Sequence, residues 1–156
     1  MNLIIIGTGA AAAELTVFIN DSQKMNKTNF KIKGYLDLKS SKKKFWKKYS
    51  FSSPFLGSPE SYKFNSKEKY ILSISDILVR NKIITFLKNK KIRLENFIHH
   101  TAIVSNTAKI GNGNIIYPYC LIGPKAKIGN FNFLNSSVAI GHDSKVGDNN
   151  IFSPNC

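Results

Sequence analysis

The chain has 156 residues and a formal net charge of +14 at neutral pH. This length allows one domain or two small ones, and a hydrophobic content of 42% is sufficient for a core. No charged segment followed by an apolar run opens the chain, and no apolar run is long enough to span a bilayer. We therefore expect neither export nor membrane insertion, and we expect a cytoplasmic protein.

The positive charge is spread through Lys- and Asn-rich sequence, with clusters only at 42–48 and 88–91. The chain has only two arginines and no aromatic residues interleaved with them, so we do not expect nucleic-acid binding. Two interpretations remain open. The charge reflects a biased composition, or it attracts small anionic substrates.

The N-terminal residues predict a buried strand, a glycine turn and a helix. Residues 2–6, Asn-Leu-Ile-Ile-Ile, form a mainly apolar run. A Gly-Thr-Gly turn follows at 7–9, and small residues lead into a helical segment. The first turn of such a helix presents free N–H groups and a positive dipole end to a phosphate. A second strand at 30–36 ends in Asp37, where mononucleotide-binding units place a nucleoside contact. Alternatively, the glycines only permit a strand-to-helix turn.

Further β and α segments alternate up to about residue 97, which implies a small open parallel sheet. The basic, Ser-rich stretch at 38–53 predicts a solvated loop from which Trp46 packs back on the domain. A short strand is expected at 54–59 and a buried strand at 70–74.

A helix should then begin after Ser75 or Asp76, either of which can cap it, and run to about residue 90. Its inner stripe is expected at Ile77, Leu78, Ile83, Ile84 and Leu87.

The last third of the chain repeats every six residues. Position one of the repeat is a large apolar residue, position two is mostly Gly, and position five is small or an amide. This period fits neither an α-helix nor a flat strand, and it predicts a parallel β-helix built from hexapeptides, three to a coil. The apolar residues at position one are Val104, Ile110, Ile116, Ile122, Ile128, Leu134, Ile140, Val146 and Phe152.

In such a coil the apolar residue points inward and the small residue fits beside it, while Gly permits the turn or a close backbone approach. Cys120 and Cys156 both fall at the small position, so we expect no disulfide, as in a reducing compartment. We expect an N-terminal domain at 1–98 and the hexapeptide domain at 99–156.

One hexapeptide carries a possible acid-base group. His142 occupies position three, which points outward at a corner, and Asp143 follows it. An exposed imidazole is available for proton transfer near neutral pH, and a neighbouring carboxylate can fix its tautomer. Alternatively, His142 is a solvated turn residue, and a similar role is expected for His99 and His100, which lie in a turn at the domain boundary. No Cys/His spacing resembles a metal site.

The motifs together resemble the bacterial sugar acyltransferases. The resemblance rests on Ile-Ile-Gly-Thr-Gly-Ala with Ala-Glu-Leu, on Gly-Tyr-Leu-Asp, on Phe-Leu-Gly-Ser, and on Gly-His-Asp within the hexapeptides. This family comprises UDP-amino-sugar N-acetyltransferases and sialic acid O-acetyltransferases. The resemblance implies an α/β Rossmann-like domain followed by a left-handed parallel β-helix, with further coils beyond those present here.

The resemblance also implies roles for individual residues. His142 would be the general base and Asp143 its support, while Gly7, Thr8 and Gly9 would line the nucleotide phosphates and Asp37 the nucleoside. Acetyl-CoA would be the co-substrate, no metal would be needed, and the chain would form a homotrimer.

We therefore predict an acetyl-CoA-dependent N-acetyltransferase that acts on a UDP-linked 4-amino sugar for surface glycan biosynthesis. One alternative is O-acetylation of sialic acid or another sugar. The other is a shortened, non-catalytic module that binds nucleotide sugar and trimerises.

Overall fold

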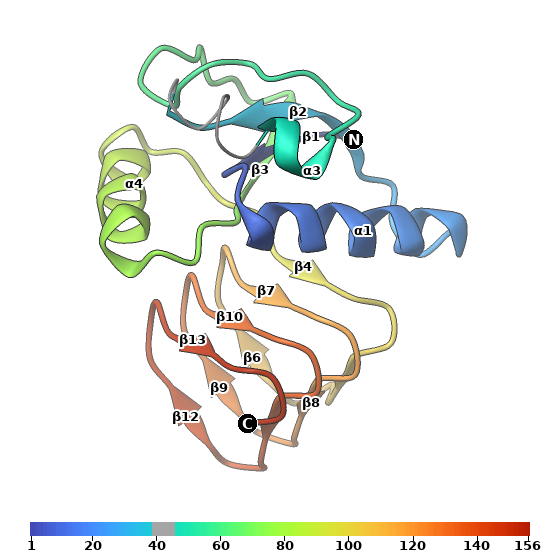
Figure 1. The fold of residues 1–156 in the computed structure, drawn as a ribbon. Coiled ribbons are helices and arrows are strands. Elements are labelled where there is room, and N and C mark those ends of the chain that lie inside the picture. Colours follow the sequence, from blue (N-terminus) through green and yellow to red (C-terminus); the bar gives the residue numbers. More distant parts are fainter. Residues whose placement is uncertain (39–45) are drawn as a thin grey trace. The chain divides into compact units, whose positions relative to one another are not determined.

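The computed structural model describes residues 1–38 and 46–156, so residues 39–45 of the predicted basic loop lie outside the described residues. The chain divides into two compact units, Met1–Leu94 and Glu95–Cys156 (Figure 1). The division falls before the predicted boundary at 98/99. The reason is that the strand Phe97–Ile98 already hydrogen bonds within the second unit.

The N-terminal unit contains a three-stranded parallel sheet. Its strands are β1 (Asn2–Ile6), β2 (Lys31–Leu36) and β3 (Glu68–Leu72), arranged in the order β2-β1-β3. Residues 3–6 of the central strand are fully buried, as expected for a parallel strand covered on both faces. The strands predicted at 2–6, 30–36 and 70–74 are confirmed within about two residues.

The helices of this unit are α1 (Ala10–Lys24), the short α3 (Lys47–Tyr49) and α4 (Ile77–Asn89). Asp76 caps α4 as predicted, because its side chain accepts from the backbone N–H groups of residues 78 and 79. In the described ranges, no helix combines the length and apolar character that a membrane span requires.

The predicted inner stripe of α4 is partly wrong. Ile83, Ile84 and Leu87 are buried, but Ile77 and Leu78 are 43% and 70% exposed. The buried face follows the helical spacing 80, 83, 84, 87 and includes the guanidinium of Arg80, so that Leu78 falls on the outer face and Ile77 on the exposed first turn.

Trp46 packs back on the N-terminal unit, as predicted. Its ring lies 5.5 Å from that of Tyr35 and also contacts the rings of Phe51 and Phe55. The short strand expected at 54–59 consists of a single parallel bridge between Phe55 and Tyr35.

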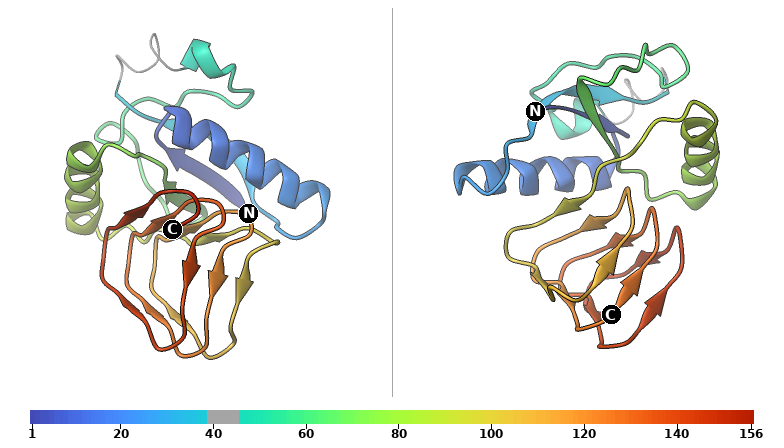
Figure 2. Two further views of the ribbon diagram at one scale, coloured as in Figure 1. Left: turned by 60° about the horizontal axis from the view of Figure 1, so that its bottom comes forward. Right: turned by 180° about the vertical axis from the view of Figure 1, so that it is seen from behind.

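The second unit is a parallel β-helix of two-residue strands, whose coils Figure 2 shows from two further sides. Sheet 1 contains β4 (Phe97–Ile98), β7 (Ile115–Ile116), β10 (Phe133–Leu134) and β13 (Ile151–Phe152). Sheet 2 contains β5 (Ile103–Val104), β8 (Leu121–Ile122) and β11 (Ala139–Ile140). Sheet 3 contains β6 (Lys109–Ile110), β9 (Lys127–Ile128) and β12 (Lys145–Val146).

The pairing register confirms three hexapeptides to a coil. Phe97 pairs with Ile115, which pairs with Phe133, so equivalent residues recur after three repeats. The apolar residues at position one pack with the small residues at position five, including Cys120, Ala126 and Val138, in one continuous core. The predicted start at Val104 is one hexapeptide late, because β4 already pairs with β7 and Ala102 already packs on the core.

Glycine at position two allows neighbouring coils to approach closely. A Cβ on Gly111 would lie 2.6 Å from the carbonyl oxygen of Gly129, and a Cβ on Gly123 would lie 2.6 Å from the backbone nitrogen of His142. The turn itself uses position four, where residues from Tyr119 to Asn155 adopt φ of about 60°. The sequence pattern did not reveal this left-handed position, although it is occupied by Asp143, Asn149 and Asn155 in the last three turns. Asn and Asp adopt the left-handed conformation more readily than most other residues.

Asparagines at position five form a ladder along one corner. Asn132 donates its backbone N–H to the side-chain oxygen of Asn114, and Asn150 donates in the same way to Asn132. Asn114 in turn donates to Asn96. These bonds pair buried backbone groups at the turns, where no strand can pair them.

A buried carboxylate, that of Glu68 at the start of β3, connects several polar groups of the N-terminal unit. Glu68 is 6% exposed and accepts hydrogen bonds from Tyr62, Asn65 and Tyr70 at 2.7–3.0 Å, and it forms an ion pair with Lys33. Burial raises the pKa of Glu68, but the hydrogen bonds from Lys33, Tyr62 and Tyr70 outweigh it, so the pKa lies below its ordinary value.

We expect Glu68→Gln to destabilise the protein by about 1–3 kcal/mol at pH 7, because the tyrosine and lysine groups lose a charged acceptor. A carboxyl whose pKa is lowered by folding stabilises above its unfolded pKa, and this contribution disappears as the pH falls through the folded value. Denaturant unfolding should therefore show a steeper loss of stability below about pH 4.5 for the wild type than for the variant. Exposed Glu60→Gln is the control; parallel pH profiles for wild type and Glu68→Gln would contradict the assignment.

Candidate active site

The predicted nucleotide-contacting residues meet at the carboxyl edge of the N-terminal sheet. Gly7, Thr8 and Gly9 follow β1, and Asp37 follows β2. All four line one cavity of about 290 Å³. Ligands of open parallel sheets bind at this edge, where the carboxyl ends of the strands meet.

Asp37 braces the glycine turn. Its Oδ2 accepts the backbone N–H of Thr8 at 2.9 Å and the Thr8 hydroxyl at 2.6 Å, while Oδ1 accepts the N–H of Leu38 at 2.7 Å. The carboxylate therefore fixes the position of Thr8 in the cavity wall. The contact of Asp37 with a nucleoside remains a prediction. For such a contact the carboxylate would use the lone pairs that do not accept the hydrogen bonds described above.

The two glycines of the turn have different structural requirements. Gly7 has φ of 124°, and a Cβ there would lie 2.3 Å from the carbonyl oxygen of Ser73. Gly9 caps α1 without a side-chain hydrogen bond, and a Cβ there would meet nothing within 4 Å. The fold thus requires glycine at position 7, while Gly9 leaves open space beside the positive end of α1.

Sequence reasoning missed the opposite wall of the cavity. It consists of Ser73, Ile74, Ser75 and Asp76, which follow β3, together with Val79 of α4. Ser73 is 1% exposed, and its hydroxyl has no hydrogen-bond partner within the described part of the chain. The topology of the sheet could have predicted this wall, because the third parallel strand must end at the same edge as the other two.

Arg80 fixes the backbone of this wall by hydrogen bonds. The residue is fully buried, and its Nη1 donates to the carbonyl oxygens of Leu72 at 3.4 Å and Ile74 at 3.1 Å. Burial lowers the pKa of Arg80 to about 10, so the guanidinium is still charged at neutral pH. Arg80 thereby holds the segment that presents Ser73 to the cavity.

The second candidate site is the corner of the β-helix between sheets 2 and 3. His142 and Asp143 both point outward there, and their side chains are 81% and 66% exposed. His142 Nδ1 lies 2.9 Å from Asp143 Oδ2. The outward position predicted for His142 is confirmed, and so is its proximity to the neighbouring carboxylate.

The hydrogen bond fixes the chemistry of the imidazole. An ionised carboxylate can only accept, so Nδ1 carries the proton and donates it to Asp143. The neutral ring then exposes the lone pair of Nε2, which is the atom that a general base uses.

The coil beneath holds this corner in place. Asp143 adopts φ of 58° and donates its backbone N–H to the carbonyl oxygen of Pro124 at 2.9 Å. Gly123 lies directly under the backbone of His142, where a Cβ would clash. The backbone of His142 therefore belongs to a rigid element, although its side chain is exposed to solvent.

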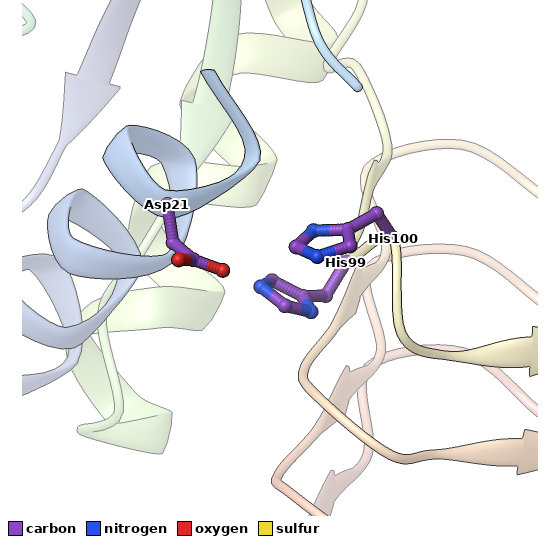
Figure 3. Close-up of side chains that lie close together, drawn as sticks. All are labelled: Asp21, His99 and His100. Carbon is purple, nitrogen blue, oxygen red and sulfur yellow. The ribbon is translucent and has the colours of Figure 1, made fainter. Parts of the chain in front are cut away.

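The other two histidines lie in the first turn of the β-helix, but they are not solvated as the sequence suggested. Their rings are 4.3 Å apart and inclined at 37° (Figure 3). His99 is 3% exposed, and its Nδ1 lies 2.9 Å from the Thr101 hydroxyl. Asp21, also labelled in Figure 3, belongs to α1 in the other unit. The imidazoles of this turn are packed, unlike that of His142.

A parallel α/β sheet with a cavity at its carboxyl edge, followed by a hexapeptide β-helix with an exposed His-Asp corner, defines the structural class of this chain. No protein-family model matches it, and no curated protein sequence does so. Solved structures do match over nearly its whole length.

The acetyltransferase domain of PglB from Neisseria gonorrhoeae FA1090 matches with a TM-score of 0.73 and 18% identity, over 98% of this chain and 71% of that chain. A histidine-to-alanine variant of GDP-perosamine N-acetyltransferase from Caulobacter crescentus, in complex with CoA and GDP-perosamine, matches with a TM-score of 0.72 and 18% identity, over 99% and 69%. WeeI from Acinetobacter baumannii AYE matches with a TM-score of 0.74 and 16% identity, over 99% and 70%.

At these identities the likeness is one of fold. The predicted resemblance to sugar acyltransferases is confirmed at that level, and the left-handed β-helix that it implied is the fold of these neighbours.

The two glycines allow a matched test of the cavity's structure. Gly7→Ala should lower the free energy of unfolding by about 1–3 kcal/mol, because alanine is strained at this φ and its methyl group meets Ser73. Gly9→Ala should leave it within about 0.5 kcal/mol of the wild type, because its methyl group meets nothing. Thermal and denaturant unfolding measure both, and equal losses for the two variants would show that the turn is described wrongly.

Proposed function

We propose that the chain is an acetyl-CoA-dependent N-acetyltransferase acting on a nucleotide-linked 4-amino sugar. The observation that carries the proposal is the His142–Asp143 corner, an exposed and oriented base on a β-helix of the acetyltransferase fold. The structure in complex with CoA and GDP-perosamine supports both substrate classes by likeness of fold. Nothing in the described residues favours sialic acid as the acceptor.

In this mechanism His142 removes a proton. Acetyl-CoA, when bound, supplies the thioester carbonyl, and the sugar amine attacks it. As the new C–N bond forms, Nε2 of His142 accepts the proton that the amine loses, while Asp143 keeps Nδ1 protonated and stabilises the imidazolium. The C–S bond of the thioester then breaks, and CoA leaves as the thiol with the proton returned from His142. A positioned base of this kind contributes roughly 10²–10⁴ in rate, and the remainder must come from alignment of the two substrates.

In this proposal the cavity of the N-terminal unit holds the nucleotide. Gly7, Thr8 and Gly9 lie at the positive end of α1, which suits a phosphate, and Ser73 brings an unpartnered hydroxyl to the same cavity. Asp37 offers an acceptor to a nucleoside donor group. We propose UDP as the nucleotide on the original resemblance, with GDP as the second candidate because the solved neighbour binds GDP-perosamine.

We also propose that the chain acts as a homotrimer. Sheet 2 turns apolar side chains outward at Ile103, which is 68% exposed, at Leu121, which is 45% exposed, and at Ala139. Tyr119 at the adjoining corner is 71% exposed. A second copy on this face would cover an apolar strip beside the corner that carries His142.

Separate titrations with acetyl-CoA and with UDP- and GDP-linked 4-amino sugars test the proposal. An enzyme should bind a member of each class. Binding of the nucleotide sugar without any binding of acetyl-CoA would instead identify a non-catalytic module.

We expect His142→Ala to reduce turnover at least about 10²-fold, because the variant lacks the imidazole that would accept the proton of the amine. The oligomeric state and the melting temperature should not change, since the side chain is exposed. Thiol release from acetyl-CoA measures the rate, and His100→Ala is the control for loss of an imidazole elsewhere. A rate that survives His142→Ala would remove this residue from the mechanism.

We expect Gly9→Val to weaken binding of the nucleotide sugar at least about tenfold, because its methyl groups fill the space where a phosphate would approach α1. Folding should be preserved, since the position is open. Calorimetric titration measures the affinity and thermal unfolding supplies the control. Unchanged affinity in a folded variant would assign the turn to structure alone.

A further inference from the structure

The three sheets of the β-helix differ in the residue that each strand turns outward. Sheet 1 carries apolar residues there, from Phe97 to Ile151, and sheet 2 carries Ile103, Leu121 and Ala139. Sheet 3 carries a lysine in every coil. We call Lys109, Lys127 and Lys145 the lysine ladder.

The ladder places like charges directly opposite one another. Lys127 pairs in register with both Lys109 and Lys145, and all three are exposed. Because neighbouring strands lie about 4.8 Å apart, three ammonium groups follow the coil axis over about 10 Å. Like charges at opposed positions are unfavourable, so the ladder does not stabilise the sheet.

The acidic side chains beside the ladder are engaged elsewhere. Asp143 accepts from His142 at one corner. Asp148, at the other corner, accepts from the backbone and the side chain of Asn130 at 2.7 and 3.2 Å. Within the described part of the chain, no ion pair joins either carboxylate to a ladder lysine. The charge of the ladder is therefore available to a ligand.

A hollow of about 280 Å³ lies on this face, next to the proposed base. Its lining consists of the ladder together with Thr107, Lys125 and Asp143. Lys125 is exposed at the corner, one coil beneath Asp143. Four cations and one hydroxyl thus surround a space that also touches the carboxylate partner of His142.

We infer that the lysine ladder binds the phosphate groups of a diphosphate-bearing substrate and so brings that substrate to the His142 corner. The inference rests on the proposed function, in which both substrates, acetyl-CoA and the nucleotide sugar, carry a diphosphate. A line of cations suits a linear array of negative charges, and each exposed contact is modest, so affinity depends on several lysines together.

The test uses inorganic pyrophosphate as the primary probe, titrated into the protein at low and at high ionic strength. The triple variant of Lys109, Lys127 and Lys145 to Gln should bind pyrophosphate at least about tenfold more weakly than the wild type, since three contacts of about 0.5 kcal/mol are lost. Its melting temperature should equal or exceed that of the wild type, because opposed like charges are removed. The single variant Lys127→Gln, in the centre of the ladder, should weaken binding by a smaller factor.

A second triple variant, Lys24, Lys67 and Lys82 to Gln, removes the same net charge from exposed positions of the N-terminal unit. Pyrophosphate affinity should survive in it. Equal losses in the two triple variants, or no pyrophosphate binding by the wild type at low ionic strength, would overturn the inference.

Parallel titrations with CoA and with a UDP-sugar then identify the source of the phosphates, since only the substrate bound at the ladder should lose affinity in the ladder variant. Pyrophosphate binding requires no acetyl transfer, so the ladder can be confirmed even if the proposed function fails. Conversely, undiminished pyrophosphate binding by the ladder variant, with acetyl transfer intact, would overturn the inference that the ladder binds phosphate and would leave the proposed function standing.

Discussion

The structure of the second unit depends on one constraint, the in-register pairing of two-residue strands between successive coils. Each strand hydrogen bonds to its equivalents in the coils above and below, so a residue type repeated along the chain becomes a column on one face. The inward columns form the core, and the asparagine column pairs the backbone at a corner. The outward columns give each sheet its own surface chemistry. A catalytic side chain placed on such a coil inherits the rigidity of the whole stack.

The same constraint explains how one exposed histidine can be held in a fixed orientation, as the proposed mechanism requires. His142 has no packing of its own, yet its backbone rests on Gly123 and its neighbour Asp143 is bonded to Pro124. Solvent-exposed side chains normally sample several rotamers, and here the hydrogen bond to Asp143 restricts the ring and selects its tautomer. The proposed chemistry thus requires only one imidazole and one carboxylate from this face, provided that both substrates are held beside it.

Much of this could be predicted because periodic patterns are local. The six-residue period identified the core residues of the β-helix and the outward position of His142, and the apolar runs located the three strands of the N-terminal sheet. Patterns of this kind reveal which residues are alike but say little about pairs distant in sequence. The bonds from Thr8 to Asp37, the wall formed by Ser73, and the anchoring of that wall by Arg80 depend on how separate strands end together. The left-handed residue at position four was missed for another reason, because it is filled by side chains as different as Tyr119 and Asn155.

The central claim is that this chain transfers an acetyl group to the amine of a nucleotide-linked sugar, with His142 as the base. The most direct measurement is the mass of the product formed from acetyl-CoA and a panel of UDP- and GDP-linked 4-amino sugars, recorded together with thiol release. We expect one of these sugars to gain a single acetyl group, matched by an equal amount of free CoA, and we expect His142→Ala to suppress both signals. Binding of the nucleotide sugars with neither acetylated product nor released thiol would contradict it.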